Sequence, residues 1–257
     1  PKVFYSLCNY YDYFNIPYPL PKLDMIAVPD FEAGAMENWG AITFREILLL
    51  QDNKTSINIR KRIAEVIAHE LWHQWSGNLV TMDWWEDLWL NESFATYMAY
   101  KAVDYYFPEW KSIEDFIVDE TSGAFEKDSL KSTHSIAVKV DNPNQIEEIF
   151  DEISYGKGGS VLRMIESFLG NESFQKGVSH YLNKHKYGNA TASDLWDSLA
   201  KFSDKPIKEI MIDWINKPGY PIIEVKKKNN QITLVQSKFN GKSNANWKIP
   251  LTIKKIE

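Results

Sequence analysis

A His-Glu-x-x-His run at residues 69–73 limits what this chain can fold into more than any other feature of its sequence. Apolar residues recur around it at helical spacing: Ile59, Ile63, Val66, Ile67 and Trp72. They predict a helix that has Ser56 as its N-cap and ends near Gly77. Residues four apart share one face of a helix, so the imidazoles of His69 and His73 can bind one metal ion. Glu70 is rotated by about 100° from His69 and therefore flanks that ion, as a general base must.

Glu92, nineteen residues after His73, is the predicted third ligand. It lies early in a second expected helix, at about residues 88–106, which Pro108 ends. If the two helices are antiparallel, the carboxylate returns to the histidine pair. Two histidines, one carboxylate and an open fourth position are typical of a catalytic zinc, whereas structural zinc sites are closed. We therefore predict one zinc ion (Zn²⁺) per chain, bound by His69, His73 and Glu92.

The rest of the chain predicts an α+β protein. Its expected strands lie at residues 23–28, 41–44, 232–235 and 251–253, where apolar and β-branched residues gather. Its further helices are expected at residues 157–169, 172–185, 193–202 and 207–216, each bounded by Gly, Asn or Pro. The change from helical to β pattern falls at Pro218-Gly219-Tyr220-Pro221, so we place a domain boundary at about residue 217.

Composition excludes several classes of protein. The 257 residues include 29 Lys and Arg against 35 Asp and Glu, a net charge of −6, so no nucleic-acid partner is expected. No run of 18 apolar residues occurs, so no membrane partner is evident. The single cysteine, Cys8, cannot form an internal disulfide and is expected to be a small core residue. His180 and His185 are five residues apart rather than four, which argues against a second metal site.

The metal motif and two others, in the same order along the chain, closely resemble those of the M1 zinc aminopeptidases. Gly34-Ala35-Met36-Glu37-Asn38 matches the family's exopeptidase motif, and Tyr155-Gly156-Lys157-Gly158 matches its catalytic-tyrosine segment. The resemblance continues to Pro218-Gly219-Tyr220-Pro221 and so covers nearly the whole chain. Asn91-Glu92-Ser93-Phe94-Ala95-Thr96 is most similar to the cytosolic puromycin-sensitive and tricorn-interacting-factor type.

This resemblance implies a thermolysin-like metallopeptidase domain at residues 1–217, whose N-terminal part is missing, with zinc between a mixed β lobe and a helical lobe. Residues 218–257 would begin a β-sandwich domain. Members of the family have a β domain before this region and a helical domain after it. We therefore expect a central fragment that lacks its flanking domains and whose activity alone is in doubt. The similarity to cytosolic members implies a cytoplasmic protein.

The resemblance also implies how the catalytic residues act. Zinc lowers the pKa of a bound water to about 7. Glu70 would take the proton of that water and deliver it to the leaving amine. The Tyr155 hydroxyl would donate a hydrogen bond to the oxyanion of the tetrahedral intermediate.

The exopeptidase motif is expected to bind peptide substrates that have a free N-terminus. Glu37 would form a charge-assisted hydrogen bond with the α-ammonium group. Gly34 and Ala35 would let the substrate backbone approach closely, and Met36 would line the first side-chain pocket. Asn38 completes the motif and is assigned to the same substrate-binding segment.

Some residues depart from the family pattern. Many relatives carry a carboxylate at the position of Ala99 that supports a zinc-binding histidine, so Glu65, Asp87 or another acid would have to replace it here. Ser76 and Ser93 stand where relatives often have Phe and Gly, and we attach little weight to these two differences.

Tryptophan is unusually frequent, with ten in the chain. Six fall within the family motifs: Trp39, Trp72, Trp75, Trp84, Trp85 and Trp89. We expect most of them to form the walls of the active site.

Three alternatives to an aminopeptidase remain open. A zinc endopeptidase would use the same metal motif. The epoxide-hydrolase branch of the family is another, although its first motif usually begins Gly-Gly rather than Gly34-Ala35. The third is a zinc-binding fragment that is inactive on its own for lack of the flanking domains, or that serves only as a scaffold.

Overall fold

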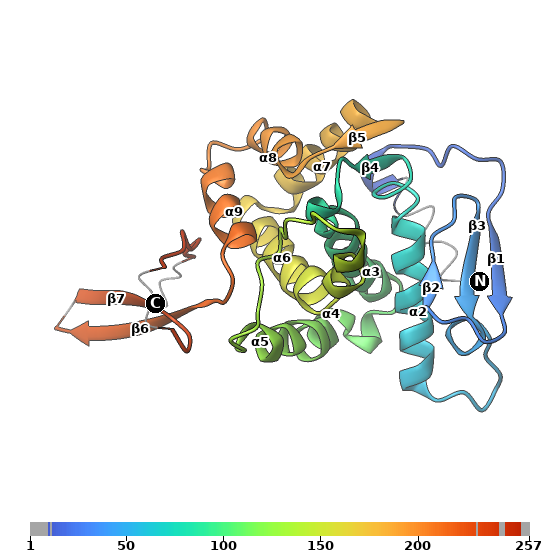
Figure 1. The fold of residues 1–257 in the computed structure, drawn as a ribbon, viewed down its shortest axis with the longest axis horizontal. Coiled ribbons are helices and arrows are strands. Elements are labelled where there is room, and N and C mark those ends of the chain that lie inside the picture. The colour runs from blue at the N-terminus through green and yellow to red at the C-terminus, as the bar shows by residue number, and fades with distance from the viewer. Residues whose placement is uncertain (1–9, 11, 230, 242–244, 253–257) are drawn as a thin grey trace.

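The computed structural model describes residue 10 and residues 12–229, 231–241 and 245–252. These residues form a small sheet, a group of packed helices and a hairpin, so the α+β prediction holds (Figure 1). Cys8 lies outside the described residues. The helices, in chain order, are α2 (Ile57–Trp72), α3 (Trp89–Tyr106), α4 (Ser112–Phe116), α5 (Ser122–Asp128), α6 (Gly158–Leu169), α7 (Asn171–His185), α8 (Ala192–Ala200) and α9 (Ile207–Asn216).

A three-stranded sheet lies beside α2 (Figure 1). Its central strand, β3 (Ala41–Arg45), pairs in parallel with β1 (Asp24–Val28) and antiparallel with β2 (Ala35–Met36). Ile42 and Phe44 alternate onto one face of β3 and are fully buried, which anchors the sheet to the core. Because β2 contacts α2, the exopeptidase motif lies next to the helix that bears the histidines.

Helices α2 and α3 pack together as the centre of the molecule. Ser56 caps α2 as predicted, and its hydroxyl accepts a hydrogen bond from the Ile59 amide at 3.4 Å. The Tyr10 hydroxyl lies 3.1 Å from the carbonyl oxygens of both Ala68 and Met98, and so links the two helices. Most of α3 is buried all round, which explains why it shows little amphipathic pattern.

The end of α2 differs from the prediction. The helix ends at Trp72, and His73 is its C-cap, with helical dihedral angles and an amide that donates to the His69 carbonyl at 3.2 Å. A tighter turn follows, in which the Trp75 amide donates to the Trp72 carbonyl at 2.9 Å. His73 therefore keeps its place one turn after His69, while the chain bends away sooner than the position of Gly77 suggested.

The segment between α3 and α6 contains structure that the sequence did not predict. Short helices α4 and α5 flank one π-helical turn, and a second π-helical turn, Ile153–Lys157, leads directly into α6. Outside this segment, a two-stranded parallel ladder that was also not predicted joins β4 (Val80–Met82) to β5 (Gly188–Ala190). These elements are too short to produce a recognisable hydrophobic period, because each spans only about two repeats at most.

After α9 the chain forms an antiparallel hairpin, β6 (Pro221–Lys228) with β7 (Gln231–Lys238), which projects from the helices (Figure 1). It confirms the strand expected at residues 232–235. Residues 251–252 are not in a strand, and residue 253 lies outside the described part of the chain. Among the described residues, no helix combines the length and the apolar character that crossing a membrane requires.

Candidate metal centre and active site

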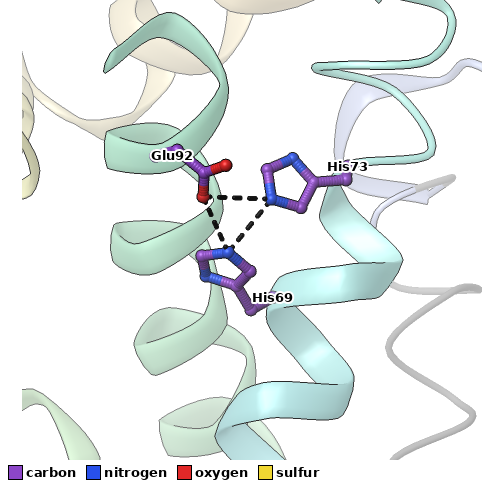
Figure 2. A group of neighbouring side chains, drawn as sticks. All are labelled: His69, His73 and Glu92. Carbon is purple, nitrogen blue, oxygen red and sulfur yellow. Dashed lines mark hydrogen bonds and ion pairs between the residues drawn. The ribbon is translucent and has the colours of Figure 1, made fainter. Parts of the chain in front are cut away.

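The three predicted ligands converge from α2 and α3 (Figure 2). His69 Nε2 lies 3.0 Å from His73 Nε2 and 3.2 Å from Glu92 Oε2, and the third side of the triangle measures 3.4 Å. Tetrahedral ligands at about 2.0 to 2.1 Å from a zinc ion are separated by roughly 3.4 Å. The donor types and their spacing therefore fit a zinc ion bound by three protein ligands.

The electrostatics of the site favour a bound cation. Burial opposes the charged form of Glu92, but His73 and the hydrogen bonds from both histidines outweigh it and lower the pKa of Glu92. Burial also opposes the charged form of His73, yet Glu92 and Glu37 raise its pKa to about 10. His69 has a pKa lowered by burial. Converging carboxylates thus give the centre an excess of negative charge that a divalent cation would neutralise.

A backbone carbonyl, rather than an acid, orients His73. Its Nδ1 lies 3.1 Å from the carbonyl oxygen of Ser76, so Nδ1–H donates there and Nε2 is the nitrogen that faces His69 and Glu92. Asp87 is occupied elsewhere, because its carboxylate accepts from the Trp89 indole at 3.1 Å and from the Ala192 amide at 2.9 Å. The only ion pair recorded for Glu65 among the described residues is with Arg62, at 3.7 Å. Neither candidate acid replaces the one that Ala99 lacks.

Glu70, the predicted base, is buried beside the metal centre. Its side chain is 6% exposed, and its Oε2 atom has no hydrogen-bond partner among the described residues. Carboxylate oxygens of Glu70 and Glu37 and a nitrogen of His73 all lie within 4.8 Å of one another. Burial raises the pKa of Glu70 to about 8, despite the opposing effect of His73. Its position beside the proposed metal ligands suits a carboxylate that accepts a proton from a bound water.

Tyr155 reaches the same centre from the π-helical turn Ile153–Lys157. Its ring stacks on that of His69, with ring centroids 6.0 Å apart and an angle of 15° between the planes. Burial, followed by repulsion from Glu92, raises the pKa of the Tyr155 hydroxyl. The raised pKa favours the protonated phenol, which can donate a hydrogen bond at neutral pH.

Ser93 holds the Tyr155 turn against α3, a role that the sequence did not suggest. Its hydroxyl donates to the Ser154 carbonyl at 2.5 Å, and it is fully buried. A Cβ atom on Gly158 would collide with this hydroxyl, so glycine is required where α6 begins. The position of Ser93, next to a proposed ligand, was the one signal in the sequence that could have identified it.

A buried ion pair fixes the other side of the same turn. Lys157 Nζ lies 2.8 Å from Asp128 Oδ2 and donates to the Gly219 carbonyl at 3.0 Å. The other oxygen of Asp128 accepts from the Gly219 amide at 2.8 Å. Both side chains are less than a tenth exposed, so the network connects α5, the Tyr155 turn and the start of the hairpin without solvent screening.

The exopeptidase motif borders the metal centre from β2. The Glu37 carbonyl accepts from the Gln74 and Asn78 side chains, at 3.2 and 2.8 Å, which fixes the motif to the end of α2. Gly34 through Glu37 line the cavity that contains the metal ligands. Asn38 is exposed, does not line this cavity and donates to the Thr43 hydroxyl at 3.2 Å.

The cavity has a volume of about 440 Å³. The metal ligands, Glu70 and Tyr155 all line it. The expectation for the tryptophans was wrong, because Trp85 is the only one of the six that lines the cavity. Trp72, Trp75 and Trp89 are instead 0 to 1% exposed and belong to the hydrophobic core behind it. Half of the motif tryptophans therefore belong to the core, whereas Trp39 and Trp84 are exposed outside the cavity.

Known proteins resemble nearly the whole of this chain. The model of the peptidase family M1 domain matches residues 3–214. The chain is 56% identical to "Probable aminopeptidase 2" of Sulfurisphaera tokodaii, over 95% of this chain and 32% of that protein. It is 56% identical to "Tricorn protease-interacting factor F2" of Thermoplasma volcanium and 52% identical to "Leucyl aminopeptidase" of Saccharolobus solfataricus, in each case over 96% of this chain and 32% of the relative. The chain thus spans about a third of the length of these curated relatives.

Proposed function

The chain belongs to peptidase family M1, and on this basis we propose that it is the catalytic part of a zinc aminopeptidase that removes the N-terminal residue from peptides. One observation carries the proposal. Three ligand-type donors meet at 3.0 to 3.4 Å in a cavity that Glu37, Glu70 and Tyr155 also line. One bound peptide would then meet a metal ion, a general base, a hydrogen-bond donor and a carboxylate that binds the α-ammonium group of the substrate.

The proposed mechanism divides the work among these side chains. Zinc, when bound by His69, His73 and Glu92, supplies a nucleophilic water at neutral pH and polarises the scissile carbonyl. Glu70 accepts the proton of the water and passes it to the leaving amine. The Tyr155 hydroxyl donates to the oxyanion that forms from the carbonyl oxygen.

Glu37 supports an exopeptidase over an endopeptidase. Its carboxylate lies within 4.8 Å of donor atoms of Glu70 and His73, and its backbone carbonyl is held near the end of α2 by Gln74 and Asn78. An α-ammonium group that binds to Glu37 places the first peptide bond of the substrate at the metal centre. A substrate bound in this way has no residue before its α-ammonium group, so only the N-terminal residue is removed. A zinc endopeptidase remains the second candidate, because the metal ligands and the base would serve both reactions.

The remaining proposals concern organisation. Residues 1–217 are proposed to be a thermolysin-like catalytic domain, with β1–β3 in one lobe and the helices in the other, and residues 218–257 to begin a β-sandwich domain. The exposed apolar side chains of the hairpin, among them Val225, Ile232 and Leu234, support a role as part of a larger sheet assembly. We also propose that the whole protein is cytoplasmic and needs its flanking domains for full activity.

The test uses the full-length parent and a panel of aminoacyl reporters, with zinc content measured on the same samples. Peptides with a free N-terminus should lose one residue at a time, whereas their N-acetylated counterparts should not be cleaved. Preference for the acetylated peptides would favour an endopeptidase. Full zinc occupancy with no turnover on any reporter would favour a protein with no enzymatic role.

A further inference from the structure

The cavity continues past the metal ligands, between α2 and α3, towards the beginning of α2. This inner end is lined by Arg62, Glu65, Thr96, Ala99, Tyr100 and Glu120. None of these residues has a part in the proposed mechanism. They lie on two packed helices and on the π-helical turn Ile117–Thr121, so the inner end has rigid walls.

The inner end lies on the opposite side of the metal centre from Glu37. Glu65 is one turn before His69 on the same face of α2, about 6 Å along the helix axis. Glu37 is attached through its carbonyl to Gln74 and Asn78, beyond the other end of the histidine pair. A peptide with its ammonium at Glu37 and its first carbonyl at the metal centre therefore directs its second residue towards Glu65, because an extended chain advances about 3.3 to 3.6 Å per residue.

Two carboxylates dominate the charge of the inner end. Glu65 is 6% exposed, and its ion pair with Arg62 is long, at 3.7 Å, with an Arg62 side chain that is 57% exposed. Glu120 accepts a hydrogen bond from the Tyr100 hydroxyl at 3.2 Å. Lys61, the neighbouring cation, is engaged elsewhere, because its ammonium lies 2.6 Å from the Asp115 carboxylate.

Glu65 is a buried carboxylate that has further acids around it. Burial raises its pKa to about 7, and Asp119 and Asp115 add to that effect while Arg62 opposes it. Burial also raises the pKa of Glu120. A second cation in this space would stabilise both carboxylates in their charged form.

An unsatisfied hydroxyl also points to a ligand in this space. Thr96 is 4% exposed, lines the cavity one turn after Glu92, and its Oγ1 atom has no hydrogen-bond partner among the described residues. A buried polar atom without a partner is costly, and an entering donor would remove that cost. Ala99, one turn further along α3, has a small side chain that leaves room for such a donor.

We propose that the inner end of the cavity is a subsite for a cationic side chain, lysine or arginine, of the second residue of the peptide substrate. Glu65 and Glu120 bind the ammonium or guanidinium group, and the Thr96 hydroxyl accepts one of its hydrogen bonds. The stem of a lysine or arginine is long enough to reach from the metal centre to Glu65. This inference rests on the proposed aminopeptidase function, which sets the direction of the peptide.

The test compares three substrates on the full-length parent: Leu-Lys-Gly, Leu-norleucine-Gly, whose second side chain lacks the charge, and a leucine anilide, which has no second residue. The wild type should have a kcat/KM about 10- to 100-fold higher for the lysine peptide than for the norleucine peptide. Glu65→Gln should remove most of this preference for the lysine peptide. Its rate on the anilide should stay within about twofold of the wild-type rate. Glu120→Gln should reduce the preference by a smaller factor. Glu114→Gln, which removes an exposed acid outside the cavity, is the matched control. It should change neither the preference for the lysine peptide nor the rate on the anilide.

Calorimetry with non-hydrolysable analogues of the two peptides gives a readout that does not depend on turnover. Tighter binding of the lysine analogue, lost in Glu65→Gln, supports the subsite. Equal affinity for the two analogues would overturn it, and so would an equal loss of rate on all three substrates in Glu65→Gln. Failure to hydrolyse any substrate with a free N-terminus would overturn the proposed function instead, and the anilide separates these two results.

Discussion

The hydroxyl of Ser93 donates to the carbonyl of Ser154 across 2.5 Å, and each residue adjoins one that the proposed chemistry uses. Ser93 follows the proposed ligand Glu92 in α3, and Ser154 precedes Tyr155 in the π-helical turn. The bond therefore ties Tyr155, the proposed oxyanion donor, to the helix that carries the proposed third metal ligand. Such turns are frequent at functional sites, where they place one side chain outside the regular helical repeat.

Replacing Ser93 by alanine should misplace Tyr155 without removing the metal. The Ser154 carbonyl would lose its buried partner, which costs about 1 to 3 kcal/mol of stability, and kcat should fall about tenfold or more as the hydroxyl of Tyr155 moves. Kinetics, zinc content and the free energy of unfolding should be measured together. Ser198→Ala removes a comparably buried serine hydroxyl in α8, which donates to the Asp194 carbonyl at 2.8 Å, and should leave kcat unchanged. Unchanged kcat in Ser93→Ala would contradict the positioning role.

Replacing Tyr155 by phenylalanine removes the hydroxyl and keeps the ring that stacks on His69. We expect kcat/KM to fall about 10²- to 10³-fold, with zinc content unchanged, because one oxyanion donor is lost. Tyr105→Phe is the control, since that side chain is 72% exposed and lies outside the metal-site cavity. A Tyr155→Phe enzyme as fast as the wild type would remove this residue from the mechanism.

His134 and Asp151 predict a pH-dependent contribution to stability. Nδ1 of His134 lies 2.7 Å from the Ser135 carbonyl and Nε2 lies 2.9 Å from Asp151 Oδ2, so both nitrogens face acceptors and the imidazolium satisfies both. The hydrogen bond to Asp151 raises the pKa of His134, even though burial opposes it. Burial would raise the pKa of Asp151, but the hydrogen bond from His134 outweighs it and lowers that pKa.

The direction of the effect follows from these two shifts. The contribution of His134 is fully present below the ordinary histidine pKa of about 6.5 and is lost as the pH rises through its raised pKa. That of Asp151 is present above about pH 4 and is lost as the pH falls through its lowered pKa. The wild type should therefore be more stable than His134→Phe at pH 5.5. The difference between their free energies of unfolding should be about 1 kcal/mol larger at pH 5.5 than at pH 9. His180→Phe should show no such gain at low pH, since the recorded partner of His180 is Lys201; a difference that does not change with pH would disprove the assignment.

The sequence predicted well those parts of the site that depend on local spacing. His69 and His73 are four residues apart, and one helical turn is enough to bring them together. To bring Glu92 to the histidines, α2 and α3 need only pack side by side in opposite directions. The two helices do pack together, and His69 Nε2 lies 3.2 Å from Glu92 Oε2. The hydrophobic period located α2, and boundary residues such as Gly, Asn and Pro located α3 and the four helices from α6 to α9.

What the sequence did not reveal depends on contacts between distant segments. Ser93 and Ser154 are 61 residues apart, and Lys157 reaches the carbonyl of Gly219 across 62 residues. No local pattern marks such pairs, because each residue alone resembles an ordinary polar side chain. The walls of the cavity were misjudged as well: Trp72 directly precedes the proposed ligand His73 and Trp89 lies three residues before Glu92, yet both side chains pack in the hydrophobic core.

The central claim, that Glu70 is the base at a zinc centre formed by His69, His73 and Glu92, is tested most directly by the turnover of Glu70→Gln at measured zinc content. The substitution keeps the shape of the side chain and removes its charge. The account predicts a zinc content equal to that of the wild type and a rate about 10²- to 10⁴-fold lower. Glu92→Ala, prepared in parallel, should lose the zinc itself. A Glu70→Gln enzyme with full zinc and the wild-type rate would contradict the account.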